Sequence, residues 1–147
     1  MANSPGYRED PDHRVHETHL DQRVTVELNG ELIADSRNVL KVDEDGYPSR
    51  YYFPRSDVDM SKLSRSNTTT HCPFKGTAHY FGIQTARFKF VDAAWTYEDP
   101  YEEHLALKER LAFYDERSPE IVIALRRDGL QIAHSFSGRL RDGEVER

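Results

Sequence analysis

Short runs of alternating apolar and polar residues, separated by turn-forming residues, constrain the fold of this chain more than any other feature. In the clearest run Val24, Val26 and Leu28 alternate with polar residues, and Asn29-Gly30 follows directly. A second apolar run comes next, and Asn-Gly between two such runs is the strongest local signal for a β-hairpin. Similar runs occupy residues 39–42, 50–53, 68–70, 78–81, 88–91, 93–97, 112–114 and 121–125. Many short strands with Gly, Pro and Asn between them predict a mainly β domain.

One segment, from Pro100 to about Arg110, has the signals of a helix. Pro100 lies near its first turn, Glu102 and Glu103 follow early, and Lys108 and Arg110 come late, which suits the helix dipole. Because the segment lacks a wide apolar stripe, we expect a single short helix on the surface.

The composition along the chain predicts three parts. Residues 1–22 are polar and contain two prolines, which indicates an N-terminal arm, mobile or draped over the surface. Residues 23–126 carry the strand pattern and form the β domain. Residues 127–147 are again polar and are expected to be an appendage, with at most one extra strand and a tail.

The arm contains His13, His16 and His19, a spacing that would place all three on one face of a helix. A metal-binding arm is one interpretation. Histidines in a solvated terminus are the more common one, because bare histidine spacings are weakly specific. We therefore expect no metal and no cofactor.

The overall balance of charge and hydropathy excludes several classes of protein. The 147 residues carry a net charge of −6 at pH 7, which is not the broad basic footprint of a nucleic-acid-binding domain. The mean hydropathy is −0.80, and no apolar run approaches the ~20 residues of a membrane span. No apolar signal core follows the N-terminus, so we expect a cytoplasmic protein with neither nucleic-acid nor membrane partners. The single cysteine, Cys72, permits no intramolecular disulfide and no four-cysteine zinc site.

Five segments, taken in order over about a hundred residues, are similar to one known bacterial family. They are NG with ADS (29–30, 34–36), YYFPR with DV (51–55, 57–58), THCPFKGTAHY (70–80), AWTYEDP (94–100) and AFY (112–114). On these residues the stretch from Val24 to Leu125 resembles the domain of unknown function 427 family.

The resemblance implies a compact β-tent, two small antiparallel sheets meeting at an angle. B-type methionine sulfoxide reductases and the ligand-binding domain of cereblon share this architecture. Those relatives usually hold zinc on two CxxC pairs, which this chain lacks, so a structural zinc is not expected. The family is sometimes labelled a nucleotidyltransferase. A Gly-Ser opening followed by paired metal-binding aspartates would support that label, and this combination is missing from the sequence.

The segment around Cys72 carries the first candidate chemistry. A cysteine reacts as the thiolate, and a nearby lysine favours that form. Lys75 follows three residues later, and Pro73 and Gly76 predict a tight bend that could bring its ammonium over the sulfur. Cys72 is thus a candidate nucleophile, with Lys75 as its charge partner or as an anion clamp. The alternative is a small buried apolar residue that fixes the bend. His71, adjacent in sequence, would point to the opposite face.

Two further segments are predicted to complete a pocket. Arg55 follows the aromatic run that includes Tyr52 and could bind a carboxylate or phosphate, although an ion pair with Asp57 is equally plausible. Trp95 and Tyr97 share one face of a strand, where they serve either as a pocket wall or as core. The full predicted site has Cys72 and Lys75 as catalytic residues and, as ligand-binding residues, Tyr52, Arg55, Asp57, Gly76, Tyr80, Trp95 and Tyr97.

Three functions are compatible with such a pocket. One is an enzyme acting on an anionic or carbonyl-containing metabolite through Cys72 or Lys75. Another is a non-catalytic module that binds a small anionic molecule, and the third is a protein-interaction domain. The familiar dehydrogenase, kinase and hydrolase motifs are missing from the sequence.

Overall fold

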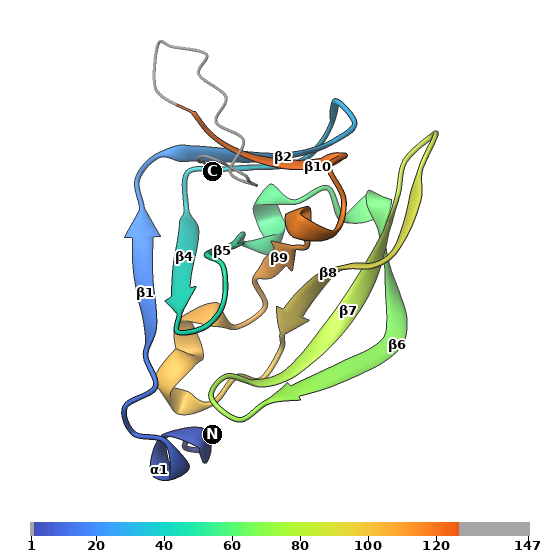
Figure 1. Ribbon diagram of the computed structural model, residues 1–147. Coiled ribbons are helices and arrows are strands. Elements are labelled where there is room, and N and C mark those ends of the chain that lie inside the picture. The colour runs from blue at the N-terminus through green and yellow to red at the C-terminus, as the bar shows by residue number, and fades with distance from the viewer. Residues whose placement is uncertain (1, 127–147) are drawn as a thin grey trace.

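The structure is a computed structural model that describes residues 2–126. Ten strands lie within this range, and Figure 1 shows how they are arranged. They are β1 (Val15–Leu20), β2 (Arg23–Leu28), β3 (Glu31–Ser36), β4 (Val39–Glu44), β5 (Arg50–Tyr52), β6 (Leu63–Cys72), β7 (Gly76–Gln84), β8 (Lys89–Tyr97), β9 (Leu111–Phe113) and β10 (Ile121–Arg126). The prediction of a mainly β domain is confirmed.

The described strands form three small antiparallel sheets, one more than the resemblance implied. Their strand orders are β1-β4-β5, β10-β2-β3 and β6-β7-β8-β9. The chain bends at residues 21–22, between β1 and β2, and again at residues 37–38, between β3 and β4. These two bends separate what would otherwise be one sheet into two, with β1 and β4 running nearly across the direction of β2 in Figure 1.

The hairpin predicted at Asn29-Gly30 is present. Asn29 and Gly30 both have positive φ, 51° and 87°, which is the geometry that a two-residue hairpin turn requires. β2 pairs with β3 on one side and with β10 on the other, so the end of the domain lies beside its beginning.

The segment that the sequence assigned to a polar arm is largely structured. Val15–Leu20 forms β1 and pairs with β4 along its whole length. Its residues are mostly polar because only one face of the strand packs against the protein. Before it, α1 (Gly6–Glu9) lies against the β6–β7 turn, where the amide of Gly6 donates to the carbonyl of Pro73 at 2.9 Å. Residues 15–20 therefore belong to the β domain.

The helix expected between Pro100 and Arg110 is shorter and tighter than predicted. The helical part is η3 (Glu102–Leu107), two 3₁₀ turns joined at His104, whose φ of −126° breaks the helical path. His104 and Leu107 are buried while Leu105 is exposed, which is not the regular apolar face of an α-helix. The other short helical segments are η1 (Arg55–Asp57), η2 (Met60–Lys62) and η4 (Asp115–Arg117).

Two clusters of buried side chains fill the interior. The larger joins the β10-β2-β3 sheet to β7, β8 and β9, with Phe53 and Phe113 in edge-to-face contact at 5.8 Å. The smaller consists of Leu40, Val42, Tyr52, Ala78, Tyr80, Trp95, Tyr97, Leu107 and Ala112. This second cluster is rich in tyrosine and tryptophan, and it borders the candidate site.

Two remaining sequence predictions concern the ends and the hydropathy of the chain. The predicted C-terminal appendage, residues 127–147, lies outside the described residues. Within residues 2–126, none of the helices has the length and apolar character needed to span a bilayer.

Candidate functional site

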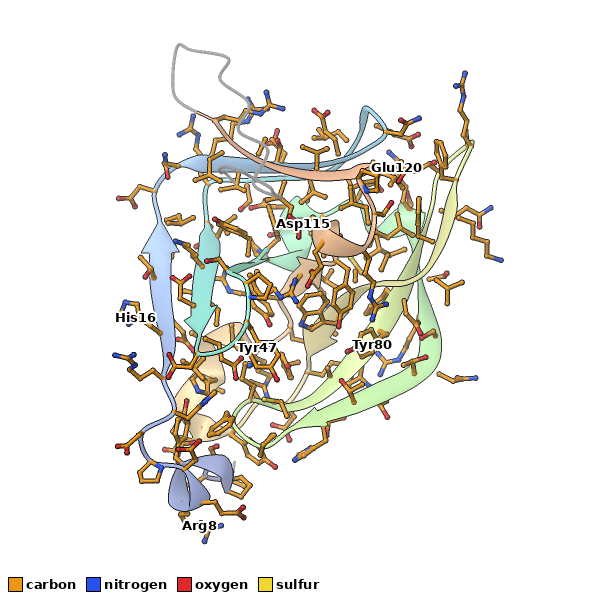
Figure 2. All side chains as sticks on the ribbon, viewed as in Figure 1. Arg8, His16, Tyr47, Tyr80, Asp115 and Glu120 are labelled. Carbon is orange, nitrogen blue, oxygen red and sulfur yellow. The ribbon has the colours of Figure 1, made fainter. Side chains whose placement is uncertain are left out.

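A cavity of about 220 Å³ lies between the β1-β4-β5 sheet and the β6-β7-β8-β9 sheet. Tyr47, on the connection from β4 to β5, and Tyr80, on β7, approach it from these two sheets (Figure 2). The complete lining is Val42, Glu44, Tyr47, Pro48, Arg50, Tyr52, Thr70, Cys72, Lys75, Tyr80, Trp95, Tyr97 and Tyr114. The cavity therefore brings together six of the nine residues that the sequence assigned to a site: Cys72, Lys75, Tyr52, Tyr80, Trp95 and Tyr97.

Aromatic residues with mutual hydrogen bonds form much of the wall. The indole N–H of Trp95 donates to the hydroxyl of Tyr52 at 3.1 Å. The hydroxyl of Tyr80 lies 3.0 Å from that of Thr70 and 3.3 Å from that of Tyr114. Burial is the main reason why the pKa of Tyr52 is raised above its ordinary value. These contacts fix the rings in place, so the cavity is largely preformed.

Tyr97 is the exception among these aromatic residues. It is 5% exposed and lines the cavity, yet its hydroxyl makes no hydrogen bond within the described part of the chain. Burial raises the pKa of Tyr97, so the hydroxyl keeps its proton at neutral pH. The cavity wall thus contains a hydroxyl donor that is available to a ligand.

The predicted bend places Cys72 and Lys75 in the cavity wall. Cys72 pairs with Gly76 across the turn from β6 to β7, and Gly76 has a φ of +123°, which other residues rarely adopt. The Cβ of a larger residue there would also lie 3.4 Å from the backbone of Asp99. Gly76 therefore shapes the turn without itself lining the cavity.

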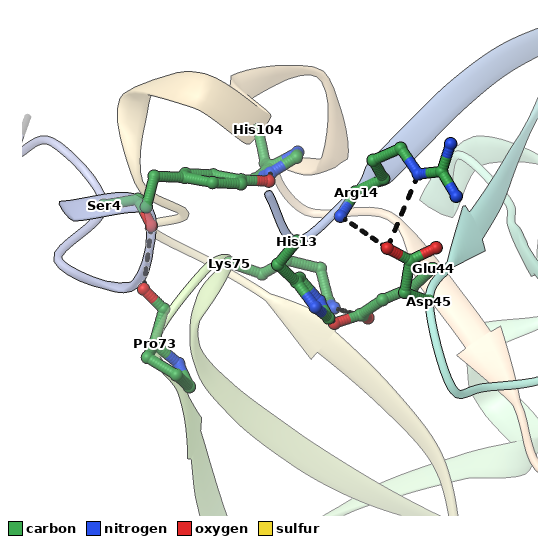
Figure 3. A network of polar contacts seen from close by, with 9 residues as sticks. Ser4, His13, Arg14, Glu44, Asp45, Pro73, Lys75 and His104 are labelled. Carbon is green, nitrogen blue, oxygen red and sulfur yellow. Dashed lines mark hydrogen bonds and ion pairs between the residues drawn. The ribbon is translucent and has the colours of Figure 1, made fainter. Parts of the chain in front are cut away.

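The ammonium group of Lys75 is bound to a carboxylate and does not stand free. Lys75 is 6% exposed and donates to Oε1 of Glu44, whose other oxygen lies 2.8 Å from Nε2 of His13 (Figure 3). His13 in turn stacks on Phe74 with ring centroids 4.0 Å apart. Sequence reasoning did not foresee Glu44, which comes from β4, a strand remote in sequence from the bend.

The N-terminal segment is held in place by hydrogen bonds near Lys75 and Glu44. Tyr7 and His104 are joined by a 2.6 Å hydrogen bond between the hydroxyl and Nε2, and Nδ1 of His104 is bonded to Glu17 at 2.7 Å. Burial, followed by the carboxylate of Glu44, raises the pKa of Tyr7 to about 12. The segment before β1 therefore packs beside Glu44 and the β6–β7 turn, although none of its described residues lines the cavity.

Arg50 is the second cation of the cavity, and the sequence analysis missed it. Its guanidinium lies over the rings of Trp95 and Tyr114, at 5.1 and 5.4 Å from their centroids. It also binds both carboxylate oxygens of Glu116, with Nη2 at 2.8 Å from Oε2. Strand alternation was the available signal, because residues two apart share a face and Tyr52 was already predicted to line the pocket.

Arg55 and Asp57, both predicted ligand-binding residues, lie away from the cavity lining. The Nε–H of Arg55 donates to the backbone carbonyl of Glu109 at 2.9 Å, and its guanidinium lies over Phe81. Asp57 accepts a 2.6 Å hydrogen bond from the hydroxyl of Ser36. Both residues stabilise the connection between β5 and β6, which explains why their pattern suggested a functional turn.

The three histidines of the N-terminal segment do not converge. His13 binds Glu44, whereas His16 is exposed and points outward from β1 (Figure 2), and His19 contacts Asn38. Within residues 2–126, no group of three or more His, Cys, Asp or Glu side chains is arranged to hold a metal ion.

The fold and the cavity define the class of this protein as a small mainly β domain with an aromatic-walled pocket between two sheets. The sequence model of the family described as "Domain of unknown function (DUF427)", also labelled NTP_transf_9, matches residues 15–124. The chain belongs to this family, as the resemblance indicated. A comparison of this chain with curated proteins found no match.

Proposed function

We propose that this protein binds a small molecule about the size of one substituted ring in the aromatic cavity. The observation that carries the proposal is the hydroxyl of Tyr97, which belongs to the cavity wall and has no hydrogen-bond partner among the described residues. A ligand with an acceptor group would receive a hydrogen bond from this hydroxyl, and such a bond contributes about 0.5–1.5 kcal/mol net.

The size of the cavity limits the ligand. Its volume of about 220 Å³ exceeds the ~150 Å³ of an apolar cavity that admits benzene, and it is below the ~300–1,000 Å³ of drug-sized sites. A single ring with one polar substituent fits within this volume.

The test uses the only tryptophan of the chain, Trp95, which lies in the cavity wall. Phenol, benzamide and benzoate should each change its fluorescence in a saturable way. Tyr97→Phe should weaken the binding of benzamide about 2- to 10-fold, because one hydrogen bond is lost. Tyr101→Phe, which removes a surface hydroxyl bonded to His71, is the matched control and should leave binding unchanged. A failure of all three probes to alter the fluorescence would refute the proposal.

Covalent catalysis is a second candidate because Cys72 is half-buried in the same wall. In this version the cavity would bind a carbonyl-containing molecule, and the thiolate would add to its carbonyl carbon: a C–S bond forms, the π electrons move to the oxygen, and the oxygen takes up the proton that the thiol released. Cys72→Ser should then abolish turnover while retaining binding. A cytoplasmic location and a small anionic partner remain predictions from the sequence.

A protein-interaction role has less support. Within the described residues the exposed large hydrophobic side chains are Leu32, Tyr47, Val91 and Leu105. They belong to four different segments of the fold, whereas an interaction surface usually gathers such residues into one patch.

A further inference from the structure

We propose that the cavity selects small planar carboxylic acids, and that Arg50 binds the carboxylate in the position that the side chain of Glu116 occupies. This inference rests on the proposed function, since it names the class of ligand for the same cavity. Glu116 is then a tethered competitor of the ligand.

The first argument is the way in which Arg50 is presented. Its side chain is 15% exposed, and the faces of Trp95 and Tyr114 hold the guanidinium plane from within the cavity wall. A guanidinium fixed in this way offers a fork of parallel N–H donors that matches a carboxylate. Glu116 already uses that fork through both of its oxygens, which shows that the geometry accepts a carboxylate.

The second argument is the charge of the cavity. The charged side chains among its described lining residues are Glu44, Lys75 and Arg50. Glu44 and Lys75 neutralise each other inside the wall, so Arg50 contributes the one positive charge that lining residues leave unbalanced. A monoanion matches a single charge, whereas a phosphate dianion would bring one negative charge too many. The charge therefore favours a monocarboxylate.

The third argument is that Glu116 can leave easily. It comes from η4, a three-residue turn, its side chain is 45% exposed, and it is not part of the cavity lining. Water reaches the Glu116 side of this ion pair and solvates the released carboxylate, while the carboxylate of the ligand takes over the hydrogen bonds of Arg50. Glu44 presents the opposite case, because its side chain is only 11% exposed and both of its oxygens are engaged. Of these two carboxylates, a ligand would displace Glu116.

The occupied state would then conserve the contacts of Arg50. A ligand carboxylate would replace that of Glu116 on the guanidinium, and the ligand ring would pack among the aromatic side chains of the wall. The hydroxyl of Tyr97 remains as a further donor for a ring substituent or for the acid itself. Glu116 would move into solvent, so Arg50 has one carboxylate partner before and after the exchange.

The experiment compares benzoate with its uncharged analogue benzamide, using Trp95 fluorescence. The wild-type protein should bind benzoate more tightly than benzamide. Glu116→Gln should tighten benzoate binding by up to about fivefold and leave benzamide unchanged, because only the acid competes with Glu116. The control is Glu109→Gln, which removes another half-exposed carboxylate paired with an arginine, Arg55, away from the cavity. It should have no effect on either probe.

A second variant, Arg50→Gln, should abolish the preference for benzoate. Because Arg50 packs on two rings, the urea unfolding midpoint of the Arg50→Gln variant is measured to verify that the variant folds. Glu116→Gln, a change at the surface, tests the inference independently. Equal affinity for benzoate and benzamide in wild type and Glu116→Gln would overturn the inference while leaving small-molecule binding intact. Benzoate binding that is lost in Arg50→Gln but unchanged in Glu116→Gln would overturn the displacement of Glu116. If phenol, benzamide and benzoate all fail to bind, the proposed function falls as well.

Discussion

Replacing Glu44 by glutamine should destabilise this protein more than a change at most other carboxylates. The side chain of Lys75 is 7% exposed and that of Glu44 is 11% exposed, so their ion pair is shielded from water. Glu44→Gln keeps the shape of the side chain and one acceptor oxygen but removes the charge. The ammonium of Lys75 then stays buried without a counter-ion.

The magnitude follows from this burial. Removing one partner of a buried ion pair costs about 3–5 kcal/mol, and the amide oxygen that remains lowers our expectation to about 2–4 kcal/mol. For a domain of this size, 1 kcal/mol corresponds to about 4 °C in the melting temperature, so Tm should fall by about 10 °C. Urea unfolding followed by Trp95 fluorescence measures the free energy, and calorimetry measures Tm.

A double-mutant cycle shows whether the pair itself is responsible. Lys75→Met removes the ammonium, so Glu44→Gln should cost much less in the Lys75→Met background than in the wild type. A matched exposed change is Asp45→Asn, since Asp45 pairs with Arg14 at the surface and should matter little. If Glu44→Gln lies within ~0.5 kcal/mol of the wild type, the reasoning about the buried pair is refuted.

Two further predictions concern Cys72 and Tyr114. Cys72 is half-buried in the cavity wall, so iodoacetamide should alkylate it in the native protein and saturating benzoate should slow the reaction, as mass spectrometry would measure. Labelling that begins only on unfolding would contradict this placement. Burial, with the hydrogen bond to Tyr80, raises the pKa of Tyr114 to about 12. The ordinary pKa of tyrosine is about 10, so the protonated Tyr114 hydroxyl contributes fully to the stability of the folded state below pH 10. This contribution is lost as the pH rises through 12. Urea titrations between pH 8 and 12 should show that the free energy of unfolding declines less steeply with pH in Tyr114→Phe than in the wild type. Identical pH dependence in the two proteins would disprove the assignment.

Much of the fold could be predicted because strand alternation is a local property. The Asn29-Gly30 turn and the runs on both sides of it needed no tertiary information. The two runs predicted at residues 88–91 and 93–97 largely form one strand, β8, and Asp92 interrupts the regular alternation within it with a positive φ of 52°. Hydroxyls of Ser66 and Thr68 on β6, two strands away in the same sheet, donate to the carboxylate of Asp92 at 2.6 Å. That irregularity depends on partners 24 and 26 residues away, which a local pattern does not contain.

The polar strand β1 could not be recognised for a related reason. Val15–Leu20 has too few apolar residues to indicate a strand, and its place in the fold comes from pairing with β4. Backbone hydrogen bonds in a sheet do not require apolar side chains, so an edge strand of this kind leaves a weak trace in the sequence.

The candidate site also has one part that the sequence predicts and another part that depends on tertiary structure. The aromatic wall was predictable because Trp95 and Tyr97 lie two residues apart on one strand, and a strand presents such residues on one face. The choice of cation was not, because Arg50 and Arg55 flank the same aromatic run, and only tertiary structure places one in the cavity and the other beside Glu109. Likewise, nothing near Lys75 in the sequence indicates that its partner is Glu44.

That partner also bears on the choice between binding and catalysis. Reactive cysteines lie beside cations that are free to face the sulfur. In this cavity Lys75 donates to Glu44, and Arg50 is bound to Glu116. Of these two cations only Arg50 has an exposed partner that a ligand can replace, and that exchange places the new carboxylate on the guanidinium. The cations are therefore arranged to hold an acid in place, and the geometry supports a binding pocket more strongly than a nucleophilic centre at Cys72.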